Sequence, residues 1–132
     1  MDAESEVLFG WGLSTQARSR VYRPTSVDEV RRAAEDARGR GLTVGHRGAG
    51  QSYGDAALNQ GGAVLAMSGL DDILEYDARE GVVRAEAGLT IDQLWRAVIE
   101  DGWWPPVVPG TSRPTLGGCA AVASQAGSAS GG

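Results

Sequence analysis

The sequence predicts an α+β fold in which helices pack on small mixed sheets. Two segments with the 3.6-residue apolar period of amphipathic helices alternate with short apolar runs that are typical of strands. The composition, 42% hydrophobic and 22% charged over 132 residues, fits a globular domain of common size. Glycine accounts for 20 residues, about twice its usual share of roughly 7%, and without a Gly-X-Y period these glycines must serve particular backbone positions.

The first elements are predicted in the order strand, helix, strand. Residues 1–19 are mixed and polar, so we expect a loosely tethered lead-in before a short strand over residues 20–23. Ser26 and Glu29 have the spacing of a capping box at a helix start. The helix would end at Gly39, and a strand over residues 42–44 would follow. Its predicted apolar stripe consists of Val27, Val30, Ala34 and Ala37.

The middle of the chain is predicted to be rich in strands, over residues 63–67, 73–76 and 82–86. A second helix would begin at Thr90, where Gln93 completes another capping box. Its apolar stripe has full helical spacing and consists of Ile91, Leu94, Trp95, Val98 and Ile99.

The C-terminal part is predicted to begin a helix at Thr115 and then to lose its pattern. Residues 123–132 are small and polar, as in a flexible linker. We therefore divide the chain into a lead-in (1–19), an N-terminal part of a domain (20–122) and a linker-like tail (123–132), with a fold that is incomplete at its C-terminus.

Composition also excludes several classes of function. A net charge of −5 argues against non-specific binding of nucleic acid or anionic membranes. A single cysteine, Cys119, excludes an internal disulfide, and a single histidine, His46, excludes a multi-histidine metal site. The longest apolar runs are about five residues, too short for a membrane span or a signal peptide. We expect a cytoplasmic protein without a resident metal.

The strongest local motif follows the strand predicted at residues 42–44 and has the sequence Arg-Gly-Ala-Gly-Gln-Ser-Tyr-Gly-Asp, residues 47–55. Gly48, Gly50 and Gly54 permit a positive φ, so that consecutive N–H groups can converge on an anion, and Ser52 adds a hydroxyl. The alternative is a glycine-rich turn at a strand end. A Rossmann fingerprint is rejected because further turn residues follow where that motif needs a helix.

A second glycine- and hydroxyl-rich segment spans residues 109–118. Thr115 would lie at a helix N-terminus, where unpaired N–H groups favour a phosphate. The alternative is a proline-rich surface loop with a helix cap. Two such segments together favour one large phosphate-bearing ligand.

No residue stands out as a catalytic group. Ser52 has no histidine partner at a known spacing, and His46 is expected to be structural. Cys119 is expected to be a buried packing residue, and the pair Trp103–Trp104 to pack in a core or under a lid. Any redox chemistry must therefore come from a cofactor.

The motifs, in this order along residues 20–122, resemble the FAD-binding (PCMH-type) domain of the vanillyl-alcohol oxidase/p-cresol methylhydroxylase flavoproteins. They are most similar to the branch of decaprenylphosphoryl-β-D-ribose oxidase and related sugar oxidases. The likeness rests on residues 24–30, 47–55 and 62–67, on Ala87-Gly88 with Leu94, and on 108–111 with Gly117-Gly118.

The resemblance implies which residues bind FAD. Those of the first motif would wrap the pyrophosphate or lie beside it, and those of the second would line the ribityl side. They are Arg47, Gly48, Ala49, Gly50, Gln51, Ser52, Tyr53 and Asp55, then Gly110, Thr111, Thr115, Gly117 and Gly118.

The resemblance also implies an oxidoreductase that oxidises an alcohol or sugar hydroxyl by hydride transfer to FAD. Many relatives attach FAD through a histidine after the glycines, where this chain has Gln51, so we expect non-covalent FAD. The likeness fades after Val122, where relatives of this branch continue into the flavin site, and the substrate domain is missing. The alternative is therefore a truncated, non-catalytic FAD-binding, nucleotide-binding or interaction module.

Overall fold

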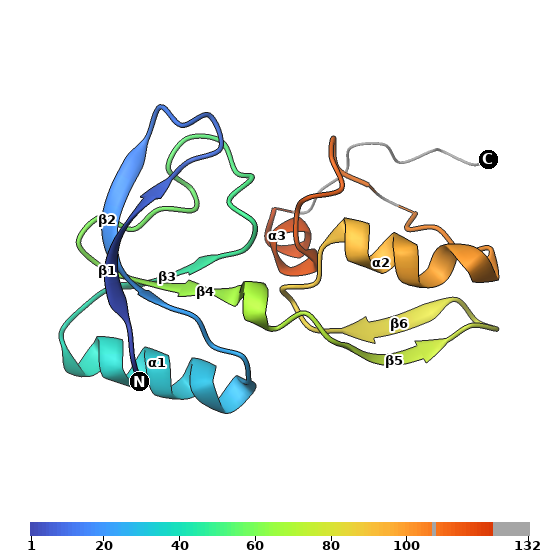
Figure 1. Cartoon of the computed structure of the whole chain (residues 1–132), viewed down its shortest axis with the longest axis horizontal. Helices are drawn as coiled ribbons and strands as arrows, with labels where there is room; N and C mark the ends of the chain where they lie inside the picture. The colour runs from blue at the N-terminus through green and yellow to red at the C-terminus, as the bar shows by residue number, and fades with distance from the viewer. Residues whose placement is uncertain (107, 123–132) are drawn as a thin grey trace. The chain divides into compact units, whose positions relative to one another are not determined.

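The computed structural model describes residues 1–106 and 108–122 and divides the chain into two compact units, Met1–Leu70 and Asp71–Gly132 (Figure 1). Both units combine helices with a small sheet, which confirms the predicted α+β class. Each unit is described by itself.

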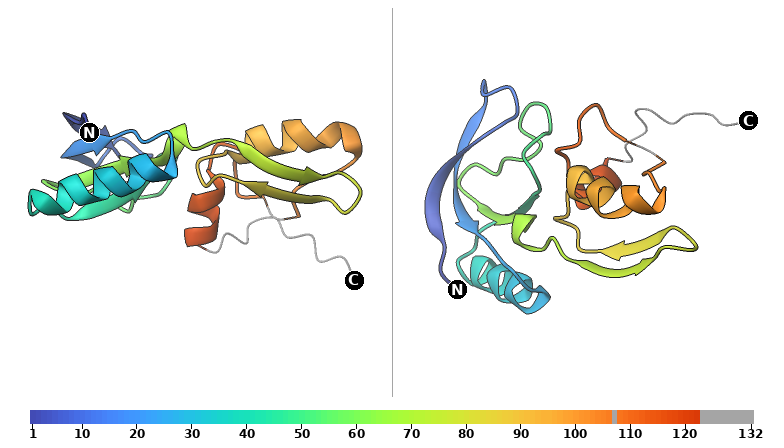
Figure 2. Two further views of the ribbon diagram at one scale, coloured as in Figure 1. Left: turned by 90° about the horizontal axis from the view of Figure 1, so that it is seen from below. Right: turned by 45° about the vertical axis from the view of Figure 1, so that its right-hand side comes forward.

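The first unit is a four-stranded mixed sheet with one helix on it. Its strands β1 (Glu4–Phe9), β2 (Gln16–Tyr22), β3 (Val44–Arg47) and β4 (Ala63–Ala66) lie in the order β1-β2-β4-β3. β1 runs antiparallel to β2, whereas β2 and β3 both pair in parallel with β4. Helix α1 (Val27–Gly39) connects β2 to β3 and covers one face of the sheet (Figures 1 and 2).

The central position of β4 explains the apolar run at residues 63–66. Ala63, Val64 and Leu65 are at most 1% exposed because β4 has a strand on each side and α1 on one face. A strand buried in this way is apolar throughout rather than alternating. After β4 the chain makes a short 3-10 turn, η1 (Met67–Gly69).

The core of the first unit contains one large polar side chain, Tyr22, which is fully buried among small residues. Its hydroxyl donates a hydrogen bond of 2.5 Å to the Asp36 carboxylate, which also accepts 2.9 Å from Arg40 Nε. These bonds, that from Arg40 first, lower the pKa of Asp36 from 3.8 to about 2.

The expected lead-in over residues 1–19 is wrong as a description of structure, because this segment forms β1 and the start of β2. Along β2 the buried positions alternate and include Ala17, Ser19 and Val21. Ser19 is only 2% exposed, and its hydroxyl donates 2.7 Å to the Asn59 carbonyl. A buried serine broke the apolar alternation that would have revealed the strand.

Two further element predictions are corrected by small shifts. On α1 the buried positions are Ala33 and Ala37, whereas Val27 is 64% exposed and Ala34 is half-buried. Two predicted positions are confirmed, because Ala37 is buried and Val30 packs against the core, whereas Ala33 takes the buried place expected for Val27 and Ala34. The next strand begins at Val44 rather than Leu42 and continues into the glycine motif as far as Arg47.

The cap of α1 contains only one of the two hydrogen bonds of the predicted capping box. The Ser26 hydroxyl accepts a hydrogen bond from Glu29 N at 3.2 Å, as the capping box requires. The Glu29 carboxylate instead accepts from the N–H and hydroxyl of Thr25, at 2.8 and 3.0 Å. The helix start is thus stabilised by two consecutive residues.

The second unit contains an antiparallel hairpin of β5 (Ile73–Asp77) and β6 (Val82–Ala85), followed by helices α2 (Ile91–Val98) and α3 (Leu116–Ala121). A 3-10 turn, η2 (Ile99–Asp101), extends α2 and ends at Gly102, whose φ of +83° is a left-handed conformation suited to glycine. The predicted capping box of Thr90 and Gln93 is complete.

The predicted tail, residues 123–132, lies outside the described residues. Within the described part, no helix has the length and apolar character needed to cross a bilayer.

Candidate cofactor-binding loops

The first candidate site is the loop that leaves β3 at residue 48 and returns to β4 at residue 63. Arg47, the first residue of the predicted motif, is the last residue of β3. Its guanidinium donates to two backbone carbonyls, Ala57 O at 3.1 Å and Phe9 O at 2.9 Å. Burial lowers the pKa of Arg47 below its usual value. Arg47 therefore holds the loop in place and adds a positive charge next to it.

Residues 49–54 of this loop present backbone donors that the described part of the chain leaves unpaired. No described residue accepts a hydrogen bond from the N–H groups of residues 49–54. The Ser52 hydroxyl also makes no hydrogen bond within the described part of the chain, although the residue is half-buried. N–H groups that the protein leaves unpaired at its surface are open to water or to a ligand, and a run of them on a glycine-rich loop is suited to an anion.

Two glycines give the loop its shape. Gly50 has a φ of +69° and Gly54 a φ of +61°, conformations that L side chains rarely adopt. At Gly50 a Cβ would also lie 2.9 Å from Arg47 Cζ, so the guanidinium occupies the space of a side chain. Alanine at this position would disturb both the loop and Arg47.

The side chains on the loop differ in their surroundings. Tyr53 is 80% exposed and meets Trp11 edge to face, with ring centroids 5.4 Å apart. Asp55 is exposed, and Gln51 Nε2 donates 3.2 Å to the Ala49 carbonyl within the loop. His46 lies on β3 before the glycines and is exposed.

In the second candidate segment, residues 109–118, the backbone donors at the helix start are paired within the protein. The N–H groups of Leu116, Gly117 and Gly118 open helix α3 and were expected to be unpaired. They donate instead to Leu89 O at 2.8 Å, Ala87 O at 2.8 Å and the Thr115 hydroxyl at 3.1 Å. The expectation of free donors at this helix start is wrong, because the preceding chain already supplies their acceptors.

The same segment in turn caps helix α2. Ile91 N donates 3.0 Å to Pro114 O and Asp92 N donates 2.8 Å to Ser112 O. A β-bridge joins Thr90 to Thr115, which is only 3% exposed. The two helix starts of the second unit therefore satisfy each other across one short junction.

Glycine has two different functions in this segment. A Cβ on Gly117 would lie 3.0 Å from the Ala87 Cβ and 3.1 Å from its carbonyl oxygen, so Gly117 allows close packing. Gly118 would place a Cβ 3.2 Å from the Thr115 hydroxyl. Gly110 has open space around it and is exposed, as is Thr111, whose hydroxyl accepts only a long bond of 3.4 Å from Arg113 N.

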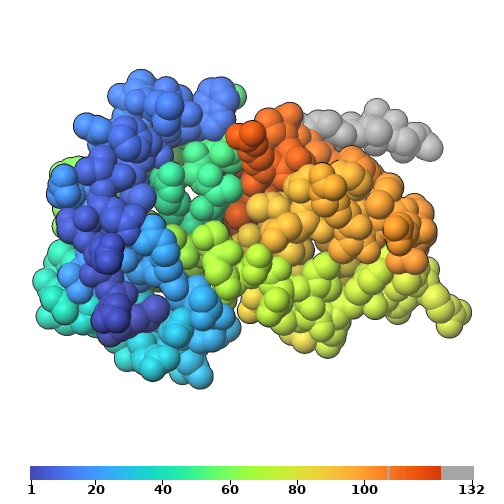
Figure 3. Space-filling model, viewed as in Figure 1, coloured from blue at the N-terminus to red at the C-terminus, as the bar shows by residue number. Residues whose placement is uncertain are grey.

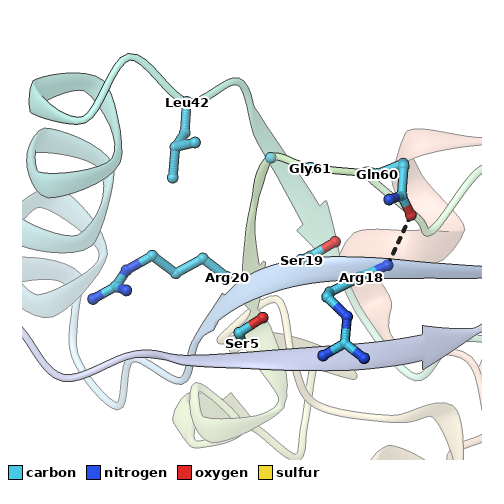
Figure 4. Close-up of a pocket in the computed structure, with 8 residues that line it drawn as sticks. Ser5, Arg18, Ser19, Arg20, Leu42, Gln60 and Gly61 are labelled. Atoms are coloured by element: carbon cyan, nitrogen blue, oxygen red, sulfur yellow. Dashed lines mark hydrogen bonds between the residues drawn. The ribbon is translucent and has the colours of Figure 1, made fainter.

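A shallow hollow of about 270 Å³ in the first unit contains two arginines but is not suited to a phosphate (Figure 4). Arg18 and Arg20 point in different directions from β2, and Arg20 Nε donates 3.1 Å to the Tyr22 hydroxyl (Figure 4). The N–H groups of Arg18 and Gly61 are already paired, with Gln60 Oε1 and Arg18 O. The residues predicted for FAD do not line this hollow.

The remaining candidates have structural roles. Cys119 is half-buried rather than buried. Trp103 stacks against Gly81 and donates 2.7 Å to Ala78 O, and Trp104 packs on Trp95 with centroids 5.6 Å apart, although both remain partly exposed. Among the described residues, no group of three or more His, Cys, Asp or Glu could hold a metal ion.

The comparison with protein families identifies the class. The model of a family described as "FAD binding domain" matches residues 19–131, and the chain therefore belongs to this family of FAD-binding domains. This confirms the family relationship that the ordered motifs predicted. The match continues beyond Val122, where the sequence likeness was expected to fade.

Two curated relatives are longer proteins, of which this chain covers a part. It is 41% identical over 115 residues to decaprenylphosphoryl-β-D-ribose oxidase of Mycolicibacterium smegmatis, covering 84% of this chain and 24% of the relative. It is 36% identical over 90 residues to D-2-hydroxyglutarate dehydrogenase of Escherichia coli, covering 67% of this chain and 9% of that protein. The chain thus spans at most about a quarter of these relatives.

Solved structures show the same fold. A cholesterol oxidase from Brevibacterium sterolicum superposes with a TM-score of 0.80 at 20% identity, over 93% of this chain and 24% of that one. A solvent-stable cholesterol oxidase gives a TM-score of 0.73 at 24% identity, over 89% and 23%. At these identities the likeness establishes the FAD-binding fold.

Sequence reasoning missed the residues that hold the first loop from the N-terminal hairpin. These include Phe9, Gly10 and Thr15, which belong to the segment expected to be a loose lead-in. The glycines that flank Trp11 were the available signal, but glycines in a polar segment are equally typical of an unstructured start.

Proposed function

We propose that this chain is the FAD-binding part of a flavin-dependent oxidoreductase and that the loop over residues 48–55 binds the pyrophosphate of FAD. The observation that carries this proposal is the run of unpaired N–H groups at residues 49–54. Six consecutive donors with the Ser52 hydroxyl match the many acceptor oxygens of a pyrophosphate. Membership of the FAD-binding-domain family supports FAD as the ligand.

The residues of this loop would act as binding and orienting groups. Arg47 would add positive charge beneath the loop without direct contact, because its guanidinium is bound to Ala57 O and Phe9 O. Gly50 would keep the backbone open to the phosphates. In the second segment, Gly110 and Thr111 are exposed and could contact the cofactor directly. Thr115, Gly117 and Gly118 would support it through the shape of the segment.

Bound FAD would supply the hydride acceptor for oxidation of an alcohol or sugar hydroxyl. The substrate would lose a hydride from carbon and a proton from its hydroxyl and become a carbonyl compound. The two curated relatives, a ribose oxidase and a hydroxyglutarate dehydrogenase by name, support oxidation at a carbon that bears a hydroxyl. The chain's own residues would bind and orient the cofactor for this step.

We further propose that FAD is held non-covalently. Gln51 stands after the glycines, and its amide nitrogen bonds to Ala49 O within the loop. His46 lies before the glycines on β3. Unfolding in guanidinium chloride followed by filtration should release all flavin into the filtrate, whereas flavin that stays with the polypeptide would contradict this part of the proposal.

The cofactor proposal is tested by titrating the 132-residue chain with FAD, ADP-ribose and riboflavin and by following flavin fluorescence. We expect FAD to bind, ADP-ribose to compete because it carries a pyrophosphate, and riboflavin to bind far more weakly. A chain that does not bind FAD would refute the proposal. Anaerobic addition of sugars or alcohols to the FAD-loaded chain then tests the redox half, because FAD binding without bleaching would limit the chain to a non-catalytic FAD-binding module.

A further inference from the structure

The geometry points to a function for the N-terminal hairpin. Its residues 9–15 form a clamp that holds the proposed FAD-binding loop in the conformation that presents its N–H groups. The clamp consists of the end of β1, the turn and Thr15 before β2. All of it lies outside the matched family region, which begins at residue 19. This inference rests on the proposed function of residues 48–55 and names residues that position the loop.

Two hydrogen bonds join the clamp to the loop. The Thr15 hydroxyl donates 2.9 Å to the carbonyl of Gly54, which has a positive φ. From the other side, Arg47 Nη2 donates 2.9 Å to the Phe9 carbonyl while Nη1 binds Ala57 O. The loop is thereby fixed at both sides of its unpaired donors, residues 49–54.

Close packing strengthens this junction. Gly10 is buried, and a Cβ there would lie 2.5 Å from Gly54 O and would also meet the Thr15 hydroxyl. Trp11 contacts Tyr53 edge to face at 5.4 Å. Figures 1 and 3 show the hairpin turn and the loop side by side in the first unit, as the contacts require.

Backbone hydrogen bonds close the turn of the clamp. Gly10 N donates 2.9 Å to Thr15 O and Leu13 N donates 3.0 Å to Gly10 O. Leu13 has a φ of +60°, in the left-handed region. A turn that is closed by its own hydrogen bonds can restrict the loop that it contacts.

The sharpest test compares Gly10→Ala with Gly12→Ala. The two glycines lie in the same turn, but a Cβ at Gly12 has only Ser14 Oγ nearby, at 3.8 Å. For Gly10→Ala we expect FAD to bind at least tenfold more weakly and the NMR order parameters of the backbone amides of residues 49–54 to fall, while Gly12→Ala stays within twofold of the unmodified chain. Equal effects of the two variants would overturn the clamp.

A milder pair removes one hydroxyl at a time. Thr15→Val should weaken FAD binding about fivefold, a factor that corresponds to one lost hydrogen bond. Thr15→Ser, which keeps the hydroxyl, should restore it. Thr43→Val is the matched control, because it removes a threonine hydrogen bond of 3.1 Å to Asn59 at the far end of the same loop. A loss in Thr43→Val as large as in Thr15→Val would show that general stability, and not the clamp, controls binding.

Backbone order parameters from NMR relaxation distinguish failure of the clamp from failure of the proposed function. If the chain binds no FAD, the order parameters of residues 49–54 still decide the clamp, because they are measured without ligand. Lower order parameters in Gly10→Ala and Thr15→Val only would support the clamp, and unchanged order parameters would refute it.

Discussion

The two glycine- and hydroxyl-rich segments have similar compositions, but their backbone donors are used in opposite ways. In the loop at residues 48–55 the N–H groups of residues 49–54 are unpaired within the described structure. In the segment at residues 109–118 the first three N–H groups of α3 are bound to Leu89 O, Ala87 O and the Thr115 hydroxyl. A motif rich in glycine and threonine therefore does not by itself indicate a ligand site.

The difference arises from what lies next to each segment. Residues 87–92 provide acceptors beside the second segment, and the two helix starts of that unit cap each other. The first loop is held by side chains instead, those of Arg47 and Thr15, which bind carbonyls and leave the amides unpaired. Bonds to carbonyls can fix a loop while its N–H groups remain available for an anion.

The largest effect on stability is expected at Gly117, in the segment whose helix-start donors are paired. A valine there would force side-chain atoms against Ala87, whose carbonyl oxygen is already 3.1 Å from the position of a Cβ. We expect Gly117→Val to lower the free energy of unfolding by up to about 3 kcal/mol, as overpacked sites do. Urea unfolding monitored by circular dichroism measures this.

Gly110→Val is the matched control, because nothing lies within 4 Å of its Cβ position. Its effect on stability should stay below about 0.5 kcal/mol. If Gly110→Val destabilises the chain as much as Gly117→Val, close packing is not the reason for the glycine at residue 117.

At Gly50 the effect should appear in FAD binding. A φ of +69° costs a non-glycine residue about 1–2 kcal/mol, and the new Cβ would displace the Arg47 guanidinium. We expect Gly50→Ala to weaken FAD binding by about tenfold or more, since about 1.4 kcal/mol corresponds to a factor of ten. Fluorescence titration measures the dissociation constant.

Gly39→Ala provides the control for a glycine change in the same unit, because Gly39 ends helix α1 and has open space around it. It should leave the FAD dissociation constant unchanged. A Gly50→Ala chain that binds FAD normally would mean that the loop does not need its left-handed residue for binding.

The threonines of the second segment provide a smaller test. Thr115 caps α3 and is 3% exposed, so Thr115→Val should cost about 1 kcal/mol of stability, as loss of an N-cap does. Thr111→Val should cost less, because the Thr111 hydroxyl is exposed and accepts only a 3.4 Å bond. Thermal unfolding of the two variants measures the difference. Equal losses would contradict the distinct roles given to them here.

Local patterns predicted the fold well where one sequence signal was sufficient. The capping box at Thr90 and Gln93 and the apolar run at residues 63–66 both gave the correct elements. They failed where burial depended on distant partners. Ser19 can be buried because the backbone carbonyl of Asn59 accepts a hydrogen bond from its hydroxyl. Helix α1 buries Ala33 because the sheet lies close to it.

The candidate sites show the same limit. Glycine spacing indicated the loop at residues 48–55, since flexible backbone positions are visible in a sequence. It could not show that Arg47 binds two carbonyls or that the donors of Gly117 and Gly118 are occupied. Hydrogen-bond partners separated by many residues decide whether a donor is free, and a local motif contains no information about them.

The smallest expected effect is the response of the first unit to acid. The pKa of Asp36 is held at about 2, below 3.8, by hydrogen bonds from Arg40 and then Tyr22. A depressed pKa means that the carboxylate stabilises the first unit above about pH 4 and that this contribution is lost as the pH falls towards 2. The protection of the α1 amides, corrected for the intrinsic pH dependence of exchange, should therefore fall over this interval, and Asp36→Asn should remove the change. Glu35→Gln, at the exposed neighbouring position, should keep it. If Asp36→Asn shows the same acid response as the unmodified chain, another carboxylate controls the stability of the unit that contains the proposed FAD loop.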